Sequence, residues 1–166
     1  SAHYDLSNEF YKLFLDPTMT YSSAFYGANY QLSLEDAQIN KYKQAISLCD
    51  EVNENFSVLE IGCGWGGFAK LLLEETSAKY LGITLSKNQY DYVNESLSLS
   101  TGIDRCRFEI LDYRNVVGEF DLIVSIEMFE AVGAAYWSNY FNLIKASLKP
   151  TGKALIQTIL IPVSYT

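Results

Sequence analysis

Apolar and polar positions along this chain follow a pattern that predicts strands and helices in alternation. Five short apolar runs predict strands, at residues 57–61, 79–84, 107–111, 121–126 and 153–161. Three segments with apolar positions at helical spacing predict helices, at residues 67–75, 86–98 and 136–148. Strands separated by helices favour right-handed crossovers and a mostly parallel sheet with helices on both faces. We therefore predict a Rossmann-like α/β fold whose ligand site lies in the loops at the carboxyl ends of the strands.

The first 50 residues are rich in aromatic side chains and predict helices instead of strands. Four apolar side chains fall at helical spacing behind Ser7, a candidate N-cap: Phe10, Tyr11, Phe14 and Leu15. Asp16-Pro17 is expected to end that helix. Ser33 with Asp36 resembles a capping box, which would open a second helix running to about residue 49.

The length of 166 residues suits one domain with a substantial core. We predict a single domain over residues 1–166, with a helical, aromatic-rich lead at 1–50 and the Rossmann-like core at 51–166. The core is expected to be incomplete at its C-terminal end and to lack the last strands. The chain stops within five residues of the fifth strand, which leaves an edge of the sheet uncovered.

Composition and charge exclude several classes of function. The net charge of −8 argues against a nucleic-acid partner, because phosphate binding relies on clustered Lys and Arg. Three widely separated cysteines argue against a disulfide framework or a zinc site and favour a reducing cytoplasm. His3 is the one histidine, so catalysis by a histidine in the body of the fold is not expected.

A glycine-rich loop joins the first predicted strand to its helix. Gly62, Gly64 and Gly67 form the pattern G-x-G-x-x-G within the segment VLEIGCGWGG. Glycines let the backbone turn sharply and approach a ligand, and the following helix presents free N–H groups. The pattern occurs in proteins that bind NAD, FAD or S-adenosylmethionine (SAM), so it predicts a ligand loop without deciding among them.

Two features beside this loop favour SAM. A dinucleotide site usually carries an acid about 20 residues further on, which binds the ribose. Here the second strand ends in GITLS at 82–86, which contains no acid. Glu60, just before the loop, would repel a pyrophosphate, whereas SAM carries an ammonium and a sulfonium. We therefore predict a SAM site that includes Glu60.

Four further side chains are candidates for the SAM site, and each has a structural alternative. Asp112, past the third strand, could accept a hydrogen bond from the adenine amino group or be an ordinary loop acid. Gln89 could reach the ribose hydroxyls or form a capping box with Ser86. Tyr21 and Trp65 could approach the sulfonium through cation–π attraction, or pack in the core with the other aromatic side chains.

Three stretches of the chain carry more specific motifs. The first is HYDLSNEFYKLFLDPTMTYSSAFY at 3–26, a lead that general methyltransferases lack. The second combines VLEIGCGWGG with GITLSKNQ at 82–89. The third joins SIEMFEAVG at 125–133 and Tyr136 to LIQTI at 155–159. Together they resemble the cyclopropane-fatty-acyl-phospholipid synthase family, which includes the mycolic acid cyclopropane synthases.

The resemblance implies an enzyme that joins a methylene group from SAM to the double bond of an unsaturated acyl chain. It implies that SAM is held by the lead and by the loops after the first three strands, at Tyr21, Ser22, Gly62, Gly64, Thr84, Leu85, Gln89, Asp112 and Tyr113. Glu130 matches the family's active-site glutamate; the structural alternative is an acid at the N-terminus of a helix. An alkene is a poor nucleophile, so such a site needs apolar surroundings and positioning more than a strong base.

The resemblance also implies a bound bicarbonate that removes a proton as the ring closes. Ile159 would contact it through its backbone, and Ser23 and Gln157 belong to the same pocket. Many members have cysteine in place of Ser23 and histidine in place of Gln157 and Ala131. Serine and glutamine can still hydrogen-bond an anion. The family's late tyrosine in this pocket is expected beyond Thr166.

These observations predict a SAM-dependent C-methyltransferase that makes cyclopropane fatty acids. The expected partner is an unsaturated phospholipid or a carrier-bound acyl chain, in the cytoplasm with peripheral contact at the inner membrane surface. Two alternatives stay open. One is a methyltransferase of the same fold with another product or substrate, such as a methyl-branched lipid or a small amine. The other is a non-catalytic SAM-binding fragment.

Overall fold

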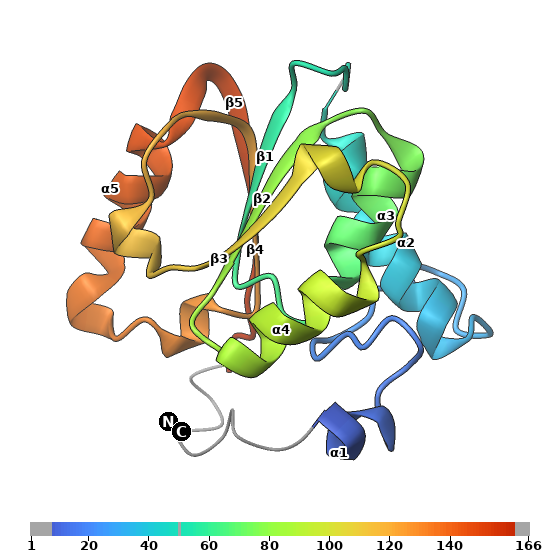
Figure 1. Ribbon diagram of the computed structural model, residues 1–166. Helices are drawn as coiled ribbons and strands as arrows, with labels where there is room; N and C mark the ends of the chain where they lie inside the picture. Colours follow the sequence, from blue (N-terminus) through green and yellow to red (C-terminus); the bar gives the residue numbers. More distant parts are fainter. Residues whose placement is uncertain (1–7, 50, 162–166) are drawn as a thin grey trace.

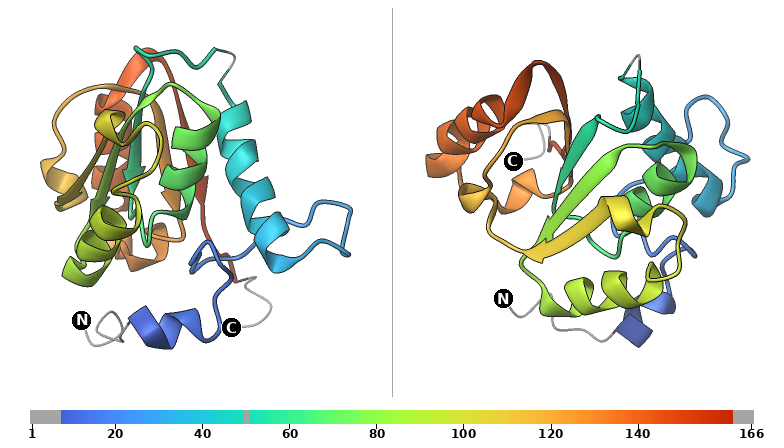
Figure 2. Two further views of the ribbon diagram at one scale, coloured as in Figure 1. Left: turned by 45° about the vertical axis from the view of Figure 1, so that its right-hand side comes forward. Right: turned by 45° about the horizontal axis from the view of Figure 1, so that its top comes forward.

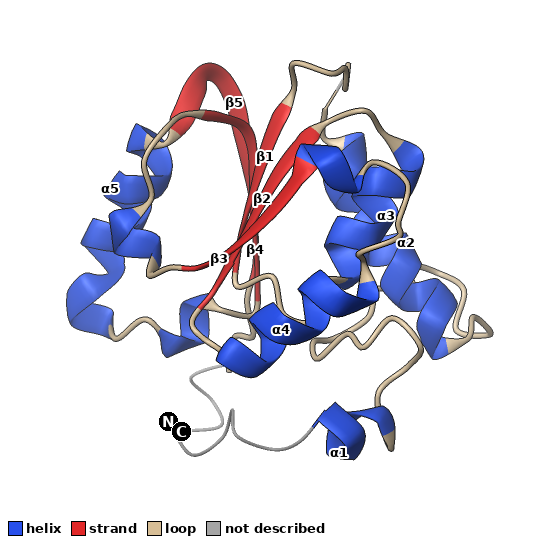
Figure 3. Cartoon of the chain, viewed as in Figure 1, coloured by secondary structure: helices blue, strands red, loops and turns tan. Residues whose placement is uncertain are grey.

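The computed structural model describes residues 8–49 and 51–161 (Figure 1). Within these residues, five parallel strands form one sheet in the order β3-β2-β1-β4-β5. The strands are β1 (Ser57–Ile61), β2 (Lys79–Thr84), β3 (Cys106–Ile110), β4 (Phe120–Ile126) and β5 (Leu148–Gln157). The α-helices are α1 (Asn8–Lys12), α2 (Leu34–Ser47), α3 (Gly67–Glu75), α4 (Lys87–Ser96) and α5 (Trp137–Ala146), drawn in blue in Figure 3. The predicted parallel Rossmann-like sheet is therefore confirmed.

Helices cover both faces of the sheet, as predicted. Along β1, Val58 packs with α2, α3 and α4, whereas Leu59 and Ile61 pack with α5 on the opposite face. This follows from the alternation of side chains along a strand. Because four of the five β1 residues are buried, the strand has the continuous apolar character of a central parallel strand. From β1 the strands are added first toward one edge of the sheet, as β2 and β3, and then toward the other edge, as β4 and β5. Ligands of such sheets bind at the switch point between β1 and β4.

Predicted and observed boundaries agree closely at the centre of the sheet. The predicted bounds of β1, α3 and β2 match the observed ones, and β3 begins and ends one residue earlier than predicted. The Ser86 hydroxyl caps α4 by accepting a hydrogen bond from the Gln89 backbone, 3.3 Å away. Ser33 caps α2 in the same way through the Asp36 backbone at 3.0 Å. Both caps confirm the interpretation of these serines.

The bounds predicted for the fifth strand are wrong at both ends. β5 begins at Leu148, which pairs with Phe120, and its register shifts before Lys153 pairs with Leu122. A Pro-Thr-Gly sequence that is typical of a turn is therefore accommodated within the strand at this irregularity. The strand also ends at Gln157, so the apolar residues that follow lie outside it. β5 is an edge of the sheet among the described residues, as expected.

The N-terminal lead lies across the carboxyl ends of the strands, with α1 beneath them in Figure 1 and in both views of Figure 2. α1 ends at Lys12, earlier than the Asp16-Pro17 break predicted from sequence, while its candidate N-cap Ser7 lies outside the described residues. No helix in the described part of the chain is long and apolar enough to cross a bilayer.

Candidate functional site

The glycine loop after β1 has the geometry of a ligand cradle. Gly62, Gly64 and Gly66 all have positive φ, at 82°, 54° and 83°. The Gly62 backbone N–H donates to the Ile83 carbonyl at 2.9 Å, which fixes the loop to the end of β2. A side chain at Gly64 would meet nothing within 4 Å, so this part of the loop faces open space that a ligand could enter. The loop therefore fits its predicted role.

Gly67 has a different role from the glycines before it. A Cβ there would lie 3.0 Å from the Thr18 carbonyl oxygen, the Thr20 hydroxyl and the Tyr42 hydroxyl. The Asp16 carboxylate holds this turn of the lead by accepting hydrogen bonds from the Thr18 backbone at 3.0 Å and the Thr18 hydroxyl at 2.6 Å. The third glycine of the pattern thus allows the lead to pack directly on the start of α3.

Aromatic side chains of the lead pack on the same loop. The Trp65 ring is buried, and its centroid lies 4.4 Å from that of Tyr11. Tyr21 contacts Tyr11 edge-on, with the centroids 5.5 Å apart, and is itself largely exposed. Trp65 therefore belongs to a small core that joins the lead to the loop, while Tyr21 borders that core from outside.

The end of β2 brings together two of the predicted SAM residues. The Thr84 hydroxyl donates to the Gln89 side-chain oxygen at 2.6 Å, and Thr84 also accepts from the Ser86 backbone at 3.1 Å. Gln89 therefore uses its backbone in the α4 cap and its side chain at the strand end, so its two predicted roles are compatible. Leu85 lies between them with an exposed side chain.

At the end of β3, Asp112 already has a cationic partner. Its carboxylate accepts from Arg114 at 2.9 Å and 2.6 Å, and the Arg114 backbone donates to it at 2.9 Å. The hydrogen bond from the Arg114 side chain is the main reason that the pKa of Asp112 lies below its usual value. An adenine amino group would share this carboxylate with an exposed guanidinium. The neighbouring Tyr113 ring packs edge-on against Tyr140, with the centroids 5.4 Å apart.

Glu60 lies in the core behind the glycine loop. It is 4% exposed and accepts a hydrogen bond from the Tyr80 hydroxyl. Room for the Tyr80 ring comes from Gly82, where a Cβ would lie 2.6 Å from the Tyr80 hydroxyl. Burial raises the pKa of Glu60 to about 7, although the Tyr80 hydrogen bond and the charge of Lys41 lower it. Its contact in this structure is with Tyr80, and its predicted role toward SAM remains a prediction.

Lys41 is a buried cation that sequence reasoning missed. Its Nζ donates to the Ser22 hydroxyl at 2.6 Å and to the Ser23 carbonyl at 2.9 Å. Burial lowers the pKa of Lys41 to about 8, against the opposing charges of Glu127, Glu60 and Asp16. Gln38 donates to the Ser22 carbonyl at 2.8 Å. α2 therefore fixes the Ser22–Ser23 segment, which the resemblance assigns to both the SAM and the anion pockets.

The residues predicted for the anion pocket meet at the ends of β4 and β5, where each contacts a carboxylate. Ser23 and Gln157 hydrogen-bond Glu127, a residue that sequence reasoning did not single out. The Ile159 backbone and the Thr158 hydroxyl, the latter at 2.8 Å, donate to Glu130. The signal that could have found Glu127 is an acid directly after a parallel strand, at the edge where ligands bind.

The Glu130 carboxylate is bound by hydrogen bonds from the residues that follow β5, and it does not lie at the N-terminus of a long helix. It lies in the 3₁₀ helix η3 (Phe129–Ala131), which is too short for a substantial dipole. Burial tends to raise the pKa of Glu130, but the hydrogen bonds from the Ile159 backbone, its own backbone and Thr158 lower it below the usual value. Glu130 is therefore a fixed carboxylate at the strand ends, where an active-site glutamate is expected.

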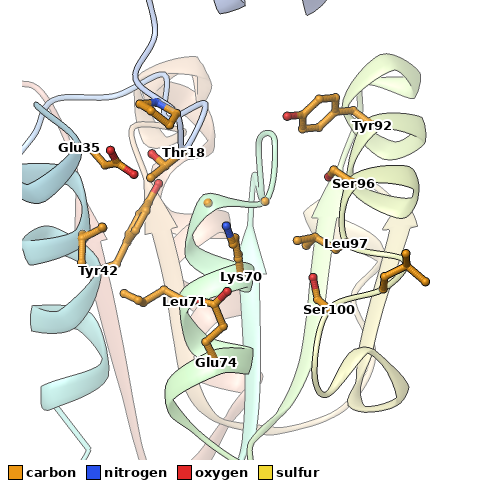
Figure 4. A pocket seen from close by; sticks show the side chains of 15 residues that line it. Thr18, Glu35, Tyr42, Lys70, Leu71, Glu74, Tyr92, Ser96, Leu97 and Ser100 are labelled. Atoms are coloured by element: carbon orange, nitrogen blue, oxygen red, sulfur yellow. The ribbon is translucent and has the colours of Figure 1, made fainter.

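A hollow in the described part of the chain lies away from these residues. It has a volume of about 420 Å³ and opens between α2, α3 and α4, with Tyr42, Lys70 and Ser100 among its lining (Figure 4). It contains Gly66 and Gly67 but none of the residues at the ends of β2 to β5. Because the predicted chemistry is at the strand ends, we place the candidate site there and not in this hollow.

The sheet order and the glycine loop at its switch point are those of the class I SAM-dependent methyltransferase fold. The structure of coclaurine N-methyltransferase bound to N-methylheliamine and SAH shares this fold, with a TM-score of 0.82 at 19% identity over 94% of this chain and 44% of that one. More specifically, the model of the family described as Mycolic acid cyclopropane synthetase matches residues 1–166. The chain belongs to this family.

Two members illustrate the similarity. The cyclopropane-fatty-acyl-phospholipid synthase of Escherichia coli (strain K12) is 37% identical over 95% of this chain and 39% of its own length. The crystal structure of the mycolic acid cyclopropane synthase CmaA1, complexed with SAH and CTAB, has a TM-score of 0.87 at 34% identity. It covers 93% of this chain, which corresponds to 54% of that one. The chain thus spans about half or less of these relatives.

Proposed function

We propose that the whole protein transfers a methylene unit from SAM to the double bond of an unsaturated fatty-acyl chain, giving a cyclopropane fatty acid. The observation that carries this proposal is the contact between the family-specific lead and the glycine loop. There Thr18 and Thr20 pack against Gly67 so tightly that a Cβ at this glycine would lie 3.0 Å from an oxygen of each. The lead sets this family apart from general methyltransferases. The E. coli relative, named as a cyclopropane synthase, supports the same reaction.

We assign the SAM site to the loops after β1, β2 and β3 together with the lead. The open space above Gly64 suits close approach of the cofactor to the backbone. Thr84 and Gln89 offer polar groups to the ribose, and Asp112 offers a carboxylate to the adenine amino group. Tyr21 and Trp65 offer aromatic surface to the sulfonium. The SAH in the CmaA1 structure supports this choice of ligand.

When bound, SAM would supply an electrophilic methyl group. The residues of this chain would contribute an apolar enclosure, built from the aromatic lead, that excludes water and holds the alkene. Glu130, fixed by Thr158 and Ile159, would place a negative charge where positive charge develops on the acyl chain. Because an alkene is a weak nucleophile, positioning and charge stabilisation are the two contributions that the reaction needs most.

The same proposal covers organisation and partners. We propose that residues 1–166 belong to one methyltransferase domain, with the lead at 1–50 and the core at 51–166. The acyl substrate would be carried by a phospholipid or by a carrier protein. The protein would act in the cytoplasm, with peripheral contact at the inner membrane surface for a phospholipid substrate.

The test is incubation of the whole protein with SAM and vesicles of a monounsaturated phospholipid, followed by mass spectrometry and proton NMR of the acyl chains. We expect a gain of one CH₂ group with the upfield signals of a cyclopropane. Glu130→Gln should lower the rate by about 100-fold or more. Glu54→Gln, an exposed acid before β1, should leave it unchanged.

Three other results would favour the alternatives. The same gain in mass without cyclopropane signals would indicate a methyl-branched or methylene product. Methylation of a small amine in place of the lipid would indicate another substrate. SAM binding without turnover of any acceptor would indicate a non-catalytic SAM-binding protein.

A further inference from the structure

Glu127 occupies a strained position at the switch point of the sheet. It directly follows β4, and its φ of 50° lies in the left-handed region, which a residue with a Cβ adopts at a cost. Its backbone N–H still donates to the Gln157 carbonyl at 2.8 Å, so the β4–β5 pairing extends to this residue. Non-glycine residues keep such a conformation when their surroundings fix them, and this occurs most often at functional sites.

The surroundings of Glu127 fix one oxygen of its carboxylate. Oε1 accepts hydrogen bonds from the Ser23 backbone N–H at 2.9 Å, the Ser23 hydroxyl at 2.5 Å and Gln157 Nε2 at 2.9 Å. Gln157 also donates to the Ser23 hydroxyl at 3.1 Å, so the three side chains form one network. These three donors all bond Oε1, and within the described part of the chain no hydrogen bond reaches Oε2. One oxygen is therefore held while the other is available to a proton.

This network uses the groups that the family resemblance assigns to bicarbonate. Ser23 and Gln157 donate to Glu127, and the third assigned group, the Ile159 backbone N–H, donates to Glu130. A dissolved anion would have to displace a carboxylate from these donors and then lie beside it. Two like charges at such a distance repel one another, which disfavours a further anion beside Glu127.

Lys41, which bonds the Ser22–Ser23 segment, does not offer a free positive charge to a further anion. Lys41 is buried and directs its ammonium to the Ser22 hydroxyl and the Ser23 carbonyl. The negative charges of Glu127 and Asp16 also act on this ammonium, so it is not an isolated positive charge that an added anion would neutralise. The residues present therefore do not fit a bound bicarbonate.

We propose that the Glu127 carboxylate replaces bicarbonate in this protein and is itself the base for ring closure. This rests on the proposed function. In that step a C–H bond of the transferred methyl group breaks, and its electron pair forms the second C–C bond of the ring at the cationic carbon. The proton passes to Oε2 of Glu127, which becomes a neutral carboxylic acid and later releases the proton to solvent. Ser23 and Gln157 are positioning residues that hold the carboxylate through Oε1.

The test combines a binding measurement with product analysis on the whole protein. Binding of isotopically labelled bicarbonate is followed by NMR line broadening for the wild type, Glu127→Gly and the control Glu119→Gln, an exposed acid before β4. We expect no binding to the wild type or the control. We expect binding to Glu127→Gly, because this change frees Ser23 and Gln157. Glycine is compatible with the backbone conformation here, and an unfolding curve verifies the fold of each variant.

The product arm uses Glu127→Gln, which keeps the size of the side chain but cannot take up the proton. We expect cyclopropane formation to fall by about 100-fold or more, with a larger share of methylated products that lack the ring. Wild-type turnover should be equal in buffer depleted of carbon dioxide and in buffer with added bicarbonate. SAM binding by Glu127→Gln should stay within about twofold of the wild type.

Specific bicarbonate binding to the wild type, or a rate that depends on added bicarbonate, would overturn the proposal. Wild-type rates of ring closure in Glu127→Gln would overturn it as well. If the wild type methylated no lipid at all, the proposed function and the catalytic role of Glu127 would both fall. The binding arm would still decide whether Glu127 or bicarbonate fills the pocket, so the two failures are distinguishable.

Discussion

The hydroxyl oxygens of Thr20 and Tyr42 lie 2.7 Å apart, and this hydrogen bond joins the lead to α2 directly over Gly67. A Cβ added to this glycine would lie 3.0 Å from both hydroxyl oxygens. Gly67→Ala should therefore lower the free energy of unfolding by about 1–3 kcal/mol, because the added methyl group forces the turn of the lead away from α3. Denaturant unfolding measures this change.

Gly133 provides the matched control for that substitution. A Cβ at Gly133 would lie 3.7 Å from the Tyr136 ring, which is ordinary contact. Gly133→Ala should change the free energy of unfolding by less than about 0.5 kcal/mol. Equal effects of the two substitutions would show that the contact over Gly67 does not hold the lead in place.

The buried pair of Glu60 and Tyr80 predicts a pH dependence of stability. Because the pKa of Glu60 rises from 4.5 to about 7 on folding, the folded protein holds this proton more tightly than the unfolded chain. The stabilisation is complete below pH 4.5 and is lost as the pH rises through 7. As the pH rises from about 5 to about 8, the free energy of unfolding should fall less for Glu60→Gln than for the wild type. The difference between the two decreases should be about 1–3 kcal/mol.

Urea unfolding at a series of pH values measures this difference. Glu119→Gln changes an exposed acid and should follow the wild-type curve. A Glu60→Gln curve parallel to that of the wild type would mean that Glu60 keeps its ordinary pKa in the folded protein. The same variant also tests the predicted role of Glu60 toward SAM, since losing the negative charge should weaken SAM binding.

Substitutions in the ion pair of Asp112 and Arg114 distinguish an effect on stability from an effect on SAM binding. Arg114 is exposed, so Arg114→Met should leave the free energy of unfolding nearly unchanged. If Asp112 accepts the adenine amino group, Asp112→Ala should weaken SAM binding about tenfold, while Arg114→Met should not weaken it. Isothermal titration calorimetry measures both affinities. An unchanged affinity in Asp112→Ala would remove this residue from the SAM site.

The two tryptophans differ enough to report on the site separately. Trp65 lies in the glycine loop and is 7% exposed, whereas Trp137 begins α5 and is 48% exposed. SAM should therefore change the fluorescence of Trp137→Phe, in which only Trp65 emits, and leave that of Trp65→Phe unchanged. The opposite pattern would place the ligand away from the glycine loop.

The sequence predicted those parts of the fold where local pattern and tertiary packing agree. β1, α3 and β2 have uninterrupted apolar character or clear helical spacing, and they lie at the buried centre of the molecule. β5 was predicted with the wrong bounds because both of its ends depend on neighbours. Leu148 joins the sheet by pairing with Phe120 across an irregularity in register, which no local pattern encodes. Beyond Gln157, the backbone at Ile159 bonds Glu130 in place of another strand.

In the candidate site, too, some residues could be predicted from the sequence and others could not. Gly62, Gly64 and Gly67 could be chosen from sequence because their spacing follows from one turn between a strand and a helix. The partners of Glu127 could not, because Ser23 precedes it by 104 positions and Gln157 follows it by 30. Only the folded sheet brings these side chains together. Two of the three substitutions noted against the family pattern, at Ser23 and Gln157, thus share one partner.

The most direct test of the proposed cyclopropane synthesis uses SAM with a fully deuterated methyl group. The whole protein is incubated with this SAM and monounsaturated phospholipid vesicles, and the acyl chains are analysed by mass spectrometry and NMR. The account predicts a cyclopropane whose ring methylene carries two deuterium atoms, with the third lost as the ring closes. Acyl chains without deuterium, or a deuterated product with an intact methyl group and no ring, would contradict it.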